Sequence, residues 1–146
     1  MAIREIRKEG DPILRKKCKE VTKFDEKLAI LLDDMYDTMV RSDGVGLAGP
    51  QVGILKRCFV VDVGEGRIDA VNPRILETSG EQTDQEGCLS VPETWRDVTR
   101  PNQVTFQAFD REGKEYTMTV EGLFARAILH ENDHLDGILF IDRVTE

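Results

Sequence analysis

The stretch LFARAILHENDHL, residues 123–135, decides the fold of the C-terminal part of the chain and contains both of its histidines. His130 and His134 lie four residues apart, with Glu131 next to the first of them. This spacing places both imidazoles on one face of a helix, which we expect from about residue 123 to 135, ended by Asp136-Gly137. Two imidazoles one turn apart can converge on one divalent metal ion, and Glu131 can reach a water molecule bound to it. The alternative is a helix with two unconnected histidines and a chance glutamate.

A second helix is expected near the N-terminus, over Asp25–Val40, stopping near Asp43-Gly44. Its apolar residues recur at helical spacing, and acidic residues occupy the outer face, which is typical of an amphipathic helix that packs against a core. The apolar positions are Leu28, Leu31, Leu32, Met35 and Met39.

Short apolar and alternating segments between these two helices predict β-strands. We expect strands at Arg57–Val63, Ile68–Val71, around Ile75, Gln103–Phe109, a return strand with Tyr116, Met118 and Val120 after the turn Asp110–Gly113, and a short last strand at Ile138–Ile141. The order and the hairpin-style links predict an α+β fold with mostly antiparallel sheet around the C-terminal helix. A chain of 146 residues is expected to form one domain, residues 1–146.

Composition narrows the class of protein. The chain is 40% hydrophobic and 33% charged, as in a soluble globular protein, and its formal net charge of −8 argues against a nucleic-acid duplex or an anionic membrane as a partner. The charged N-terminus is unlike a signal peptide, and no run of apolar residues has the length of a membrane span, so we expect a cytoplasmic protein. The three cysteines are then expected to be thiols or metal ligands rather than disulfides, with Cys58 a core residue and Cys18 without a role.

A catalytic metal site of this type needs a third protein ligand and one open position. The carboxylates downstream of His134 are few, namely Asp136, Asp142 and Glu146, and the third histidine of the metzincin pattern would fall at Phe140. The best remaining candidate is Cys88, because a thiolate is a strong ligand for a borderline divalent metal. We expect it in a loop, within the sequence Glu86-Gly87-Cys88-Leu89-Ser90.

The glycine-rich stretch Gly44–Val52 is the other unusual feature. It lacks the Lys-Ser/Thr ending of a phosphate-binding loop, so a nucleotide site is a weak interpretation. It is either a turn after the first helix or an extended backbone that can pair with a peptide substrate, with Gln51 as an amide donor.

Together the three segments resemble the motifs of the peptide deformylase family, which read G-x-G-L-A-A-x-Q, E-G-C-L-S and H-E-x-x-H. The matching residues here are Gly44–Gln51, Glu86–Ser90 and His130–His134, in the same order. The N-terminal Gly10–Arg15 and the extension of the last motif to Gly137 also resemble the family, so the resemblance spans nearly the whole chain.

The resemblance implies a role for each matching residue. Cys88, His130 and His134 would bind Fe²⁺, with Zn²⁺, Ni²⁺ or Co²⁺ as substitutes, and Glu131 would move the proton of the attacking water. Gln51 and the backbone N–H of Leu89 would stabilise the oxyanion. The reaction would remove formate from the N-formylmethionine of newly synthesised polypeptides, which would be bound by Gly44, Val45, Gly46, Leu123, Arg126 and Ala127.

The chain departs from the family pattern at three places. Gly49 replaces the second alanine of the first motif, and Trp95 stands where an arginine that contacts the peptide is common, with Arg96 and Arg100 as candidates to replace it. Arg126 lies one turn before His130, where the family usually has an apolar residue lining the methionine pocket. We expect its stem to pack on the pocket rim and its head to lie in water. The alternative is that Arg126 and Trp95 reshape the pocket and widen its preference.

Two other classes of protein share part of this pattern. A metalloendopeptidase has the same core motif, but the missing downstream ligand argues against it. A closed structural metal site would need a fourth ligand and would have no use for Glu131 or Gln51. Some family members contact the ribosome through a further C-terminal helix. This sequence ends at Glu146 without one, so we expect any ribosome contact to be weak or to use another surface.

Overall fold

The computed structural model describes residues 2–144; residues 1, 145 and 146, including the candidate Glu146, lie outside this range. The helices are α1 (Glu26–Arg41), α2 (Gly122–Leu135) and the short 3₁₀ helices η1 (Pro12–Arg15), η2 (Gly49–Val52) and η3 (Phe140–Arg143). The strands are β1 (Gly46–Ala48), β2 (Cys58–Val61), β3 (Ile68–Ser79), β4 (Gln82–Cys88), β5 (Val91–Arg100), β6 (Gln103–Phe109) and β7 (Glu115–Glu121). All ladders between these strands are antiparallel, which confirms the predicted α+β class with mostly antiparallel sheet. Over residues 2–144, no helix is both long and apolar enough to cross a membrane.

The larger sheet has five strands in the order β1-β2-β3-β6-β7. Its long strand β3 pairs with β2 through its first residues and with β6 through the rest, with two register shifts along the second ladder. The predicted strand at Ile68–Val71 and the signal around Ile75 are therefore parts of one strand. The predicted hairpin at Gln103–Phe109 and its return strand corresponds to β6 and β7.

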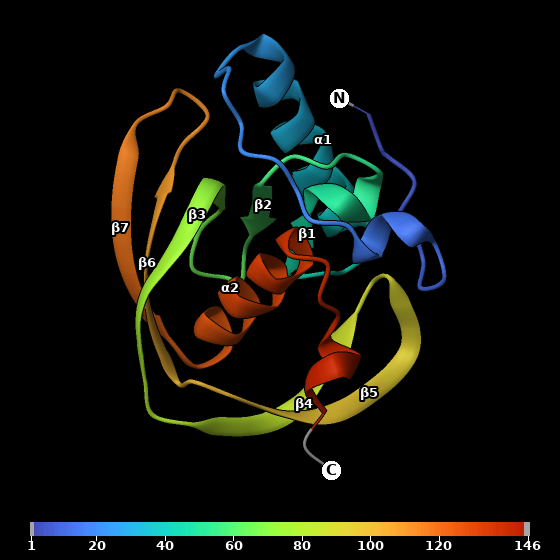
Figure 1. Ribbon diagram of the computed structural model, residues 1–146, viewed down its shortest axis with the longest axis vertical. Helices are drawn as coiled ribbons and strands as arrows, with labels where there is room; N and C mark the ends of the chain where they lie inside the picture. Colours follow the sequence, from blue (N-terminus) through green and yellow to red (C-terminus); the bar gives the residue numbers. More distant parts are fainter. Residues whose placement is uncertain (1, 145–146) are drawn as a thin grey trace.

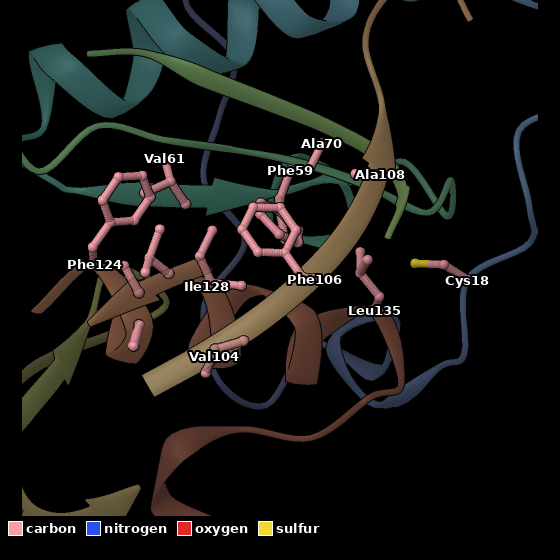
Figure 2. Close-up of a cluster of buried hydrophobic side chains, with 14 residues drawn as sticks. Cys18, Phe59, Val61, Ala70, Val104, Phe106, Ala108, Phe124, Ile128 and Leu135 are labelled. Carbon is pink, nitrogen blue, oxygen red and sulfur yellow. The ribbon is translucent and has the colours of Figure 1, made fainter. Parts of the chain in front are cut away.

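Helix α2 lies within the arc formed by the strands (Figure 1) and contacts β1, β2, β6 and β7. Its apolar side packs against the five-stranded sheet, where Phe59, Phe106 and Ile128 are fully buried (Figure 2). The opposite side of α2 carries the two histidines and faces away from this apolar cluster. The sheet therefore fixes the position of the helix on which the polar residues lie.

Helix α1 covers the other face of the same strands. Phe59 and Val61 of β2 belong to the cluster below α2, whereas Cys58 and Val60 belong to the cluster below α1. Strand β2 is thus buried on both faces, as its continuous apolar sequence predicts. Asp25 caps α1 by accepting a hydrogen bond from the Leu28 N–H at 3.1 Å, so the helix begins within one residue of the expected start.

Strands β4 and β5 form a separate two-stranded sheet that the sequence pattern did not predict (Figure 1). Cys88 is therefore the last residue of a strand, and its expected place in a loop is wrong. The hairpin buries Glu86 and Arg100 together with Val91 and Val98. Because charged residues occupy inward-facing positions, the apolar alternation that reveals a strand is missing.

The expected last strand at Ile138–Ile141 is also wrong, because the 3₁₀ helix η3 occupies this region. The carboxylate of Asp142 accepts a hydrogen bond from the Leu139 N–H at 3.0 Å, which favours a tight turn over an extended chain. Phe140 is buried and its ring stacks on that of His130, with a centroid distance of 6.1 Å.

Candidate metal centre

The polar face of α2 begins one turn before His130 and is buried along its length. His130 and His134 lie one turn apart, with ring centroids separated by 5.0 Å. Both side chains are buried, and residues of β4 and η3 cover the ring of His130, since Glu86 hydrogen-bonds it and Phe140 stacks on it. The two imidazoles therefore face the same enclosed space, as their spacing predicts.

Cys88 enters this space from the end of β4. Its sulfur and one nitrogen of each histidine all lie within 4.8 Å of one another, and Sγ is 3.4 Å from Nε2 of His134. Among residues 2–144, this is the group of histidine, cysteine and acidic side chains that could hold a metal ion. A thiolate and two imidazoles match the donors that borderline divalent metals prefer.

Asp136 and Asp142, the two described carboxylates downstream of His134, do not join this group. Asp136 accepts a hydrogen bond from Arg57 at 2.9 Å, and Asp142 is paired with Arg15. The third candidate, Glu146, lies outside the described residues.

Gln51, in η2, lies beside the sulfur of Cys88. Its side-chain oxygen accepts a hydrogen bond from the Ala48 N–H at 3.0 Å, so its amide nitrogen points into the site. That nitrogen lies 3.1 Å from Oγ of Ser90 and 3.6 Å from Sγ of Cys88. The short strand β1 and helix η2 thus turn the glycine-rich segment toward the E-G-C-L-S segment, and the three motifs meet in space.

Glu131 is 3% exposed, and its Oε1 has no hydrogen-bond partner in the protein. Burial chiefly raises the pKa of this carboxyl to about 7, and the nearby carboxylates of Glu86 and Asp133 act in the same direction. A Cβ atom at residue 46 would collide with the Glu131 carboxylate, so a side chain at this position would displace Glu131 where β1 passes the helix. Its other oxygen, Oε2, lies 4.0 Å from Nε2 of His130. A buried carboxylate with one free oxygen and a near-neutral pKa is suited to proton transfer.

Glu86 is the residue of the site that sequence reasoning missed. Its Oε2 accepts a hydrogen bond from Nδ1 of His130 at 2.5 Å, which leaves Nε2 of that ring directed toward Cys88 and His134. Burial by itself raises the pKa of Glu86, but the bonds from Arg100 and His130 hold it well below its ordinary value. Metal-binding histidines commonly donate their second N–H to a carboxylate, so an acidic residue two positions before Cys88 was the available signal.

The two histidines have different surroundings. Nδ1 of His134 is buried without a hydrogen-bond partner in the protein, and burial, with the neighbouring His130, lowers its pKa well below the ordinary value. Burial also disfavours a charge on His130, but Glu131 and Cys88 raise its pKa overall. A metal ion competes with the protons on such groups, so ion binding is expected to depend on pH.

Arg126 does not leave its head in water, and this expectation is wrong. The side chain is 4% exposed, and its guanidinium donates hydrogen bonds to Glu86 Oε1 at 2.7 Å and to the Val98 carbonyl at 3.0 Å. Helical spacing predicts the face on which Arg126 lies, but not the hairpin that covers that face. Arg100 is likewise occupied by Glu86 and Asp133.

A cavity of about 590 Å³ opens over the metal-facing side of α2. Its lining includes every residue expected at the site except His134: Gly44, Val45, Gly46, Gln51, Cys88, Leu89, Leu123, Arg126, Ala127, His130 and Glu131. Trp95 and Leu123 stand at its rim and are 60% and 55% exposed. The Trp95 ring lies over Gly87, where an added Cβ would come within 2.6 Å of it.

Comparisons with known proteins agree with this geometry. The sequence model of the family described as polypeptide deformylase matches residues 3–146. The chain is 58% identical to a peptide deformylase of Clostridium botulinum (strain Alaska E43 / Type E3), over 100% of this chain and 99% of that protein, and 53% identical to peptide deformylase 1 of Bacillus subtilis (strain 168), over 100% and 92%. The crystal structure of a peptide deformylase from Thermotoga maritima superposes with a TM-score of 0.98 at 44% identity, and covers 100% of both chains. The chain therefore belongs to the polypeptide deformylase family of enzymes.

Proposed function

We propose that the chain is a metal-dependent hydrolase of one catalytic domain, residues 1–146, that releases formate from the N-formylmethionine of newly synthesised polypeptides in the cytoplasm. The observation that carries the proposal is the convergence of Cys88, His130 and His134 within 4.8 Å, beside the buried Glu131 and at a cavity large enough for a side chain. A site of three protein ligands with an acid-base residue next to it is typical of catalysis rather than of a structural metal.

Cys88, His130 and His134 would hold the ion, which we propose to be Fe²⁺, with Zn²⁺, Ni²⁺ or Co²⁺ able to replace it. The donor set fits such an ion, because it combines one thiolate with two imidazoles in a buried pocket. A bound divalent ion would act as a Lewis acid and make a water molecule a better nucleophile at neutral pH.

Glu131 is the residue we assign to proton transfer. Its free carboxylate oxygen can take the proton of the attacking water and return it to the leaving amine. Burial raises its pKa to about 7, so the same group can accept and donate a proton near neutral pH.

Gln51 and the backbone N–H of Leu89 would stabilise the oxyanion that forms at the formyl carbon. The amide of Gln51 is held by Ala48 and Ser90, so its N–H₂ is oriented before the substrate arrives. The Gly44–Gly46 segment at the sheet edge would pair with the peptide backbone, and Leu123, Arg126 and Ala127 would border the methionine side chain.

The test is a formate-release assay on a formyl-Met peptide, with protein purified without oxygen and loaded with Fe²⁺. Oxygen is excluded because a cysteine beside ferrous iron is open to oxidation. Wild type should release formate, whereas Glu131→Ala should bind the metal and lose turnover by about 100-fold or more. The matched control is Glu121→Ala, at the exposed start of the same helix, which should act as wild type. Normal turnover in Glu131→Ala, or cleavage of internal peptide bonds by wild type, would contradict the proposal.

A further inference from the structure

The carboxylate of Glu86 receives four hydrogen bonds, two on each oxygen. Oε1 accepts from Nε of Arg100 at 2.8 Å and from Nη1 of Arg126 at 2.7 Å. Oε2 accepts from Nη2 of Arg100 at 2.7 Å and from Nδ1 of His130 at 2.5 Å. A carboxylate with all four acceptor positions filled has one fixed orientation in the protein.

Two of these donors come from one helix. Arg126 and His130 are four residues apart on α2, so they stand one above the other and hold opposite oxygens of the same carboxylate. Both oxygens of the Glu86 carboxylate are therefore bound to α2. The remaining bonds of Arg126 reach Gln82 Oε1 at 3.3 Å and the Val98 carbonyl at 3.0 Å, so this side chain joins α2 to both β4 and β5.

The four hydrogen bonds to Glu86 lie next to the metal site in the sequence of β4. Glu86 and Cys88 are separated by Gly87, at a register shift in the β4–β5 ladder, after which Cys88 pairs with Val91. Helix α2 packs against β1, β2, β6 and β7, and buried hydrogen bonds to Glu86, Arg100 and Val98 join it to β4 and β5. These bonds therefore connect the hairpin that carries the thiol to the helix that carries the imidazoles.

We propose that Arg126 is a positioning residue for the metal centre, which fixes Glu86 against α2 and so sets both the His130 ring and the approach of Cys88. The inference rests on the proposed function only for its kinetic test, because the effect on metal binding follows from the geometry alone. It replaces the view that Arg126 selects the substrate side chain, since its guanidinium is already occupied by three protein acceptors. Groups that orient metal ligands contribute about 10–100-fold to metal affinity.

The experiment compares Co²⁺ binding by wild type, Arg126→Met and Arg126→Lys, using chelator competition and the absorption spectrum of the bound ion. Arg126→Met removes all three bonds while keeping an unbranched side chain, and it should weaken Co²⁺ binding about 10–100-fold and change the spectrum. Arg126→Lys keeps the charge near Glu86 but cannot serve three acceptors. Its Co²⁺ affinity should therefore lie between that of wild type and that of Arg126→Met.

Arg143→Met is the matched control. Arg143 binds the same buried cluster through Asp133, at 2.6 Å and 3.0 Å, but does not touch Glu86 in the structure. It should bind Co²⁺ within about threefold of wild type, well below the effect of an outer ligand partner. An equal loss of Co²⁺ affinity in Arg143→Met and Arg126→Met would overturn the proposal. Removing any one positive charge from the buried cluster would then explain the effect.

Kinetics separate positioning from substrate contact. With formyl-Met peptide, Arg126→Met should lower kcat and leave KM within about twofold, because the guanidinium bonds that are lost are made with protein acceptors and the stem that borders the methionine side chain is kept. An unchanged Co²⁺ affinity together with a raised KM or an altered preference between formyl-Met and formyl-norleucine would identify a substrate contact instead. If wild type binds Co²⁺ but releases no formate, the proposed function fails while the binding comparison still tests Arg126.

A double-mutant cycle keeps the inference testable if Arg126→Met also lowers stability. Because Arg126 acts through Glu86, Arg126→Met should weaken Co²⁺ binding much less in a Glu86→Gln background than in wild type. Melting temperatures of all four proteins report the effect on folding separately. Equal and additive losses in the two backgrounds would show that Arg126 does not act through Glu86.

Discussion

The two long helices differ in the residues that they bury. Helix α1 buries an apolar stripe, Leu28, Leu31, Leu32, Met35 and Met39, against β1 and β2. Helix α2 buries an apolar stripe on one side and, on the other, the ionisable residues Arg126, His130, Glu131, Asp133 and His134. Helix α1 also buries a carboxylate, Asp34, but this residue binds the N-terminal segment. It accepts a hydrogen bond from the Ala2 N–H and pairs with Arg4.

This difference distinguishes the helix faces that stabilise the fold from the face that carries the candidate site. Burying an apolar side chain stabilises the fold, whereas burying a charge destabilises it unless the charge is paired. On α2 most buried charges are paired, but Glu131 keeps a free oxygen and His134 a free nitrogen. We infer that α1 and the apolar side of α2 contribute stability, and that the polar side of α2 exists for the metal centre.

The largest expected effect comes from Cys88→Ala, which removes a proposed metal ligand. Metal affinity and formate release should both fall by more than about 100-fold, because even residues that only support ligands contribute roughly 10–100-fold. Metal content after dialysis and turnover measure the effect. Cys18→Ala is the matched control, since Cys18 is a buried thiol outside the cluster and should leave both unchanged. Equal losses in the two variants would contradict the assignment.

Leu32→Ala tests the α1 side of the comparison. Leu32 is fully buried, so truncation should lower the free energy of unfolding by about 2–5 kcal/mol while the folded protein keeps its metal affinity. Urea denaturation and metal titration measure the two quantities. Ile30→Ala, on the half-exposed side of the same helix, should change stability by less than about 0.5 kcal/mol. A loss of metal affinity in Leu32→Ala would mean that the helices are not separate in role.

How far the sequence predicts the structure follows the same division. The apolar period of α1 predicts its bounds closely, because apolar packing accounts for most of its buried residues. The β4–β5 hairpin escapes prediction, since its inward positions hold Glu86 and Arg100. These two side chains pair with each other and with Arg126 and Asp133 of α2, which lie far away in the sequence. A strand whose buried face is charged has no apolar alternation to reveal it.

The candidate site divides in a similar way. The spacing of His130 and His134 predicts their common face, and the resemblance to a family brings Cys88 and Gln51 to the same cavity, where the structure has them. The partner of Arg126 could not be predicted, because it depends on what covers α2. The same holds for the bond between Glu86 and His130, which joins elements 44 residues apart.

The helix starts offer a smaller contrast. The Asp25 carboxylate caps α1, whereas Glu121 at the start of α2 makes no side-chain capping bond. Asp25→Ala should therefore lower the free energy of unfolding by about 1 kcal/mol, and Glu121→Ala by less than about 0.5 kcal/mol. Thermal unfolding of both variants measures the difference. A larger loss in Glu121→Ala would show that the start of α2 is held by that side chain.

The smallest expected effect concerns the half-exposed ion pairs of α1. The hydrogen bond from Arg111, with that from Arg67, lowers the pKa of Asp33 below its ordinary value of 3.8. A lowered pKa stabilises the fold above the unfolded value and loses that contribution as the pH falls through the folded value. Asp33→Asn should cost less than about 1 kcal/mol at pH 7, and the difference from wild type should shrink below pH of about 4. A difference that grows in acid would contradict this.

The separation of stability from chemistry is tested most directly by one variant measured in two ways, Glu131→Gln. The free energy of unfolding of the metal-free protein and formate release by the iron-loaded protein would be measured at pH 8, above the raised pKa of Glu131. The neutral amide has the shape of the carboxylate without its buried charge, of which one oxygen has no hydrogen-bond partner, so stability should be equal to or greater than that of wild type while turnover is lost. A variant that is less stable than wild type but still releases formate at the wild-type rate would contradict the account.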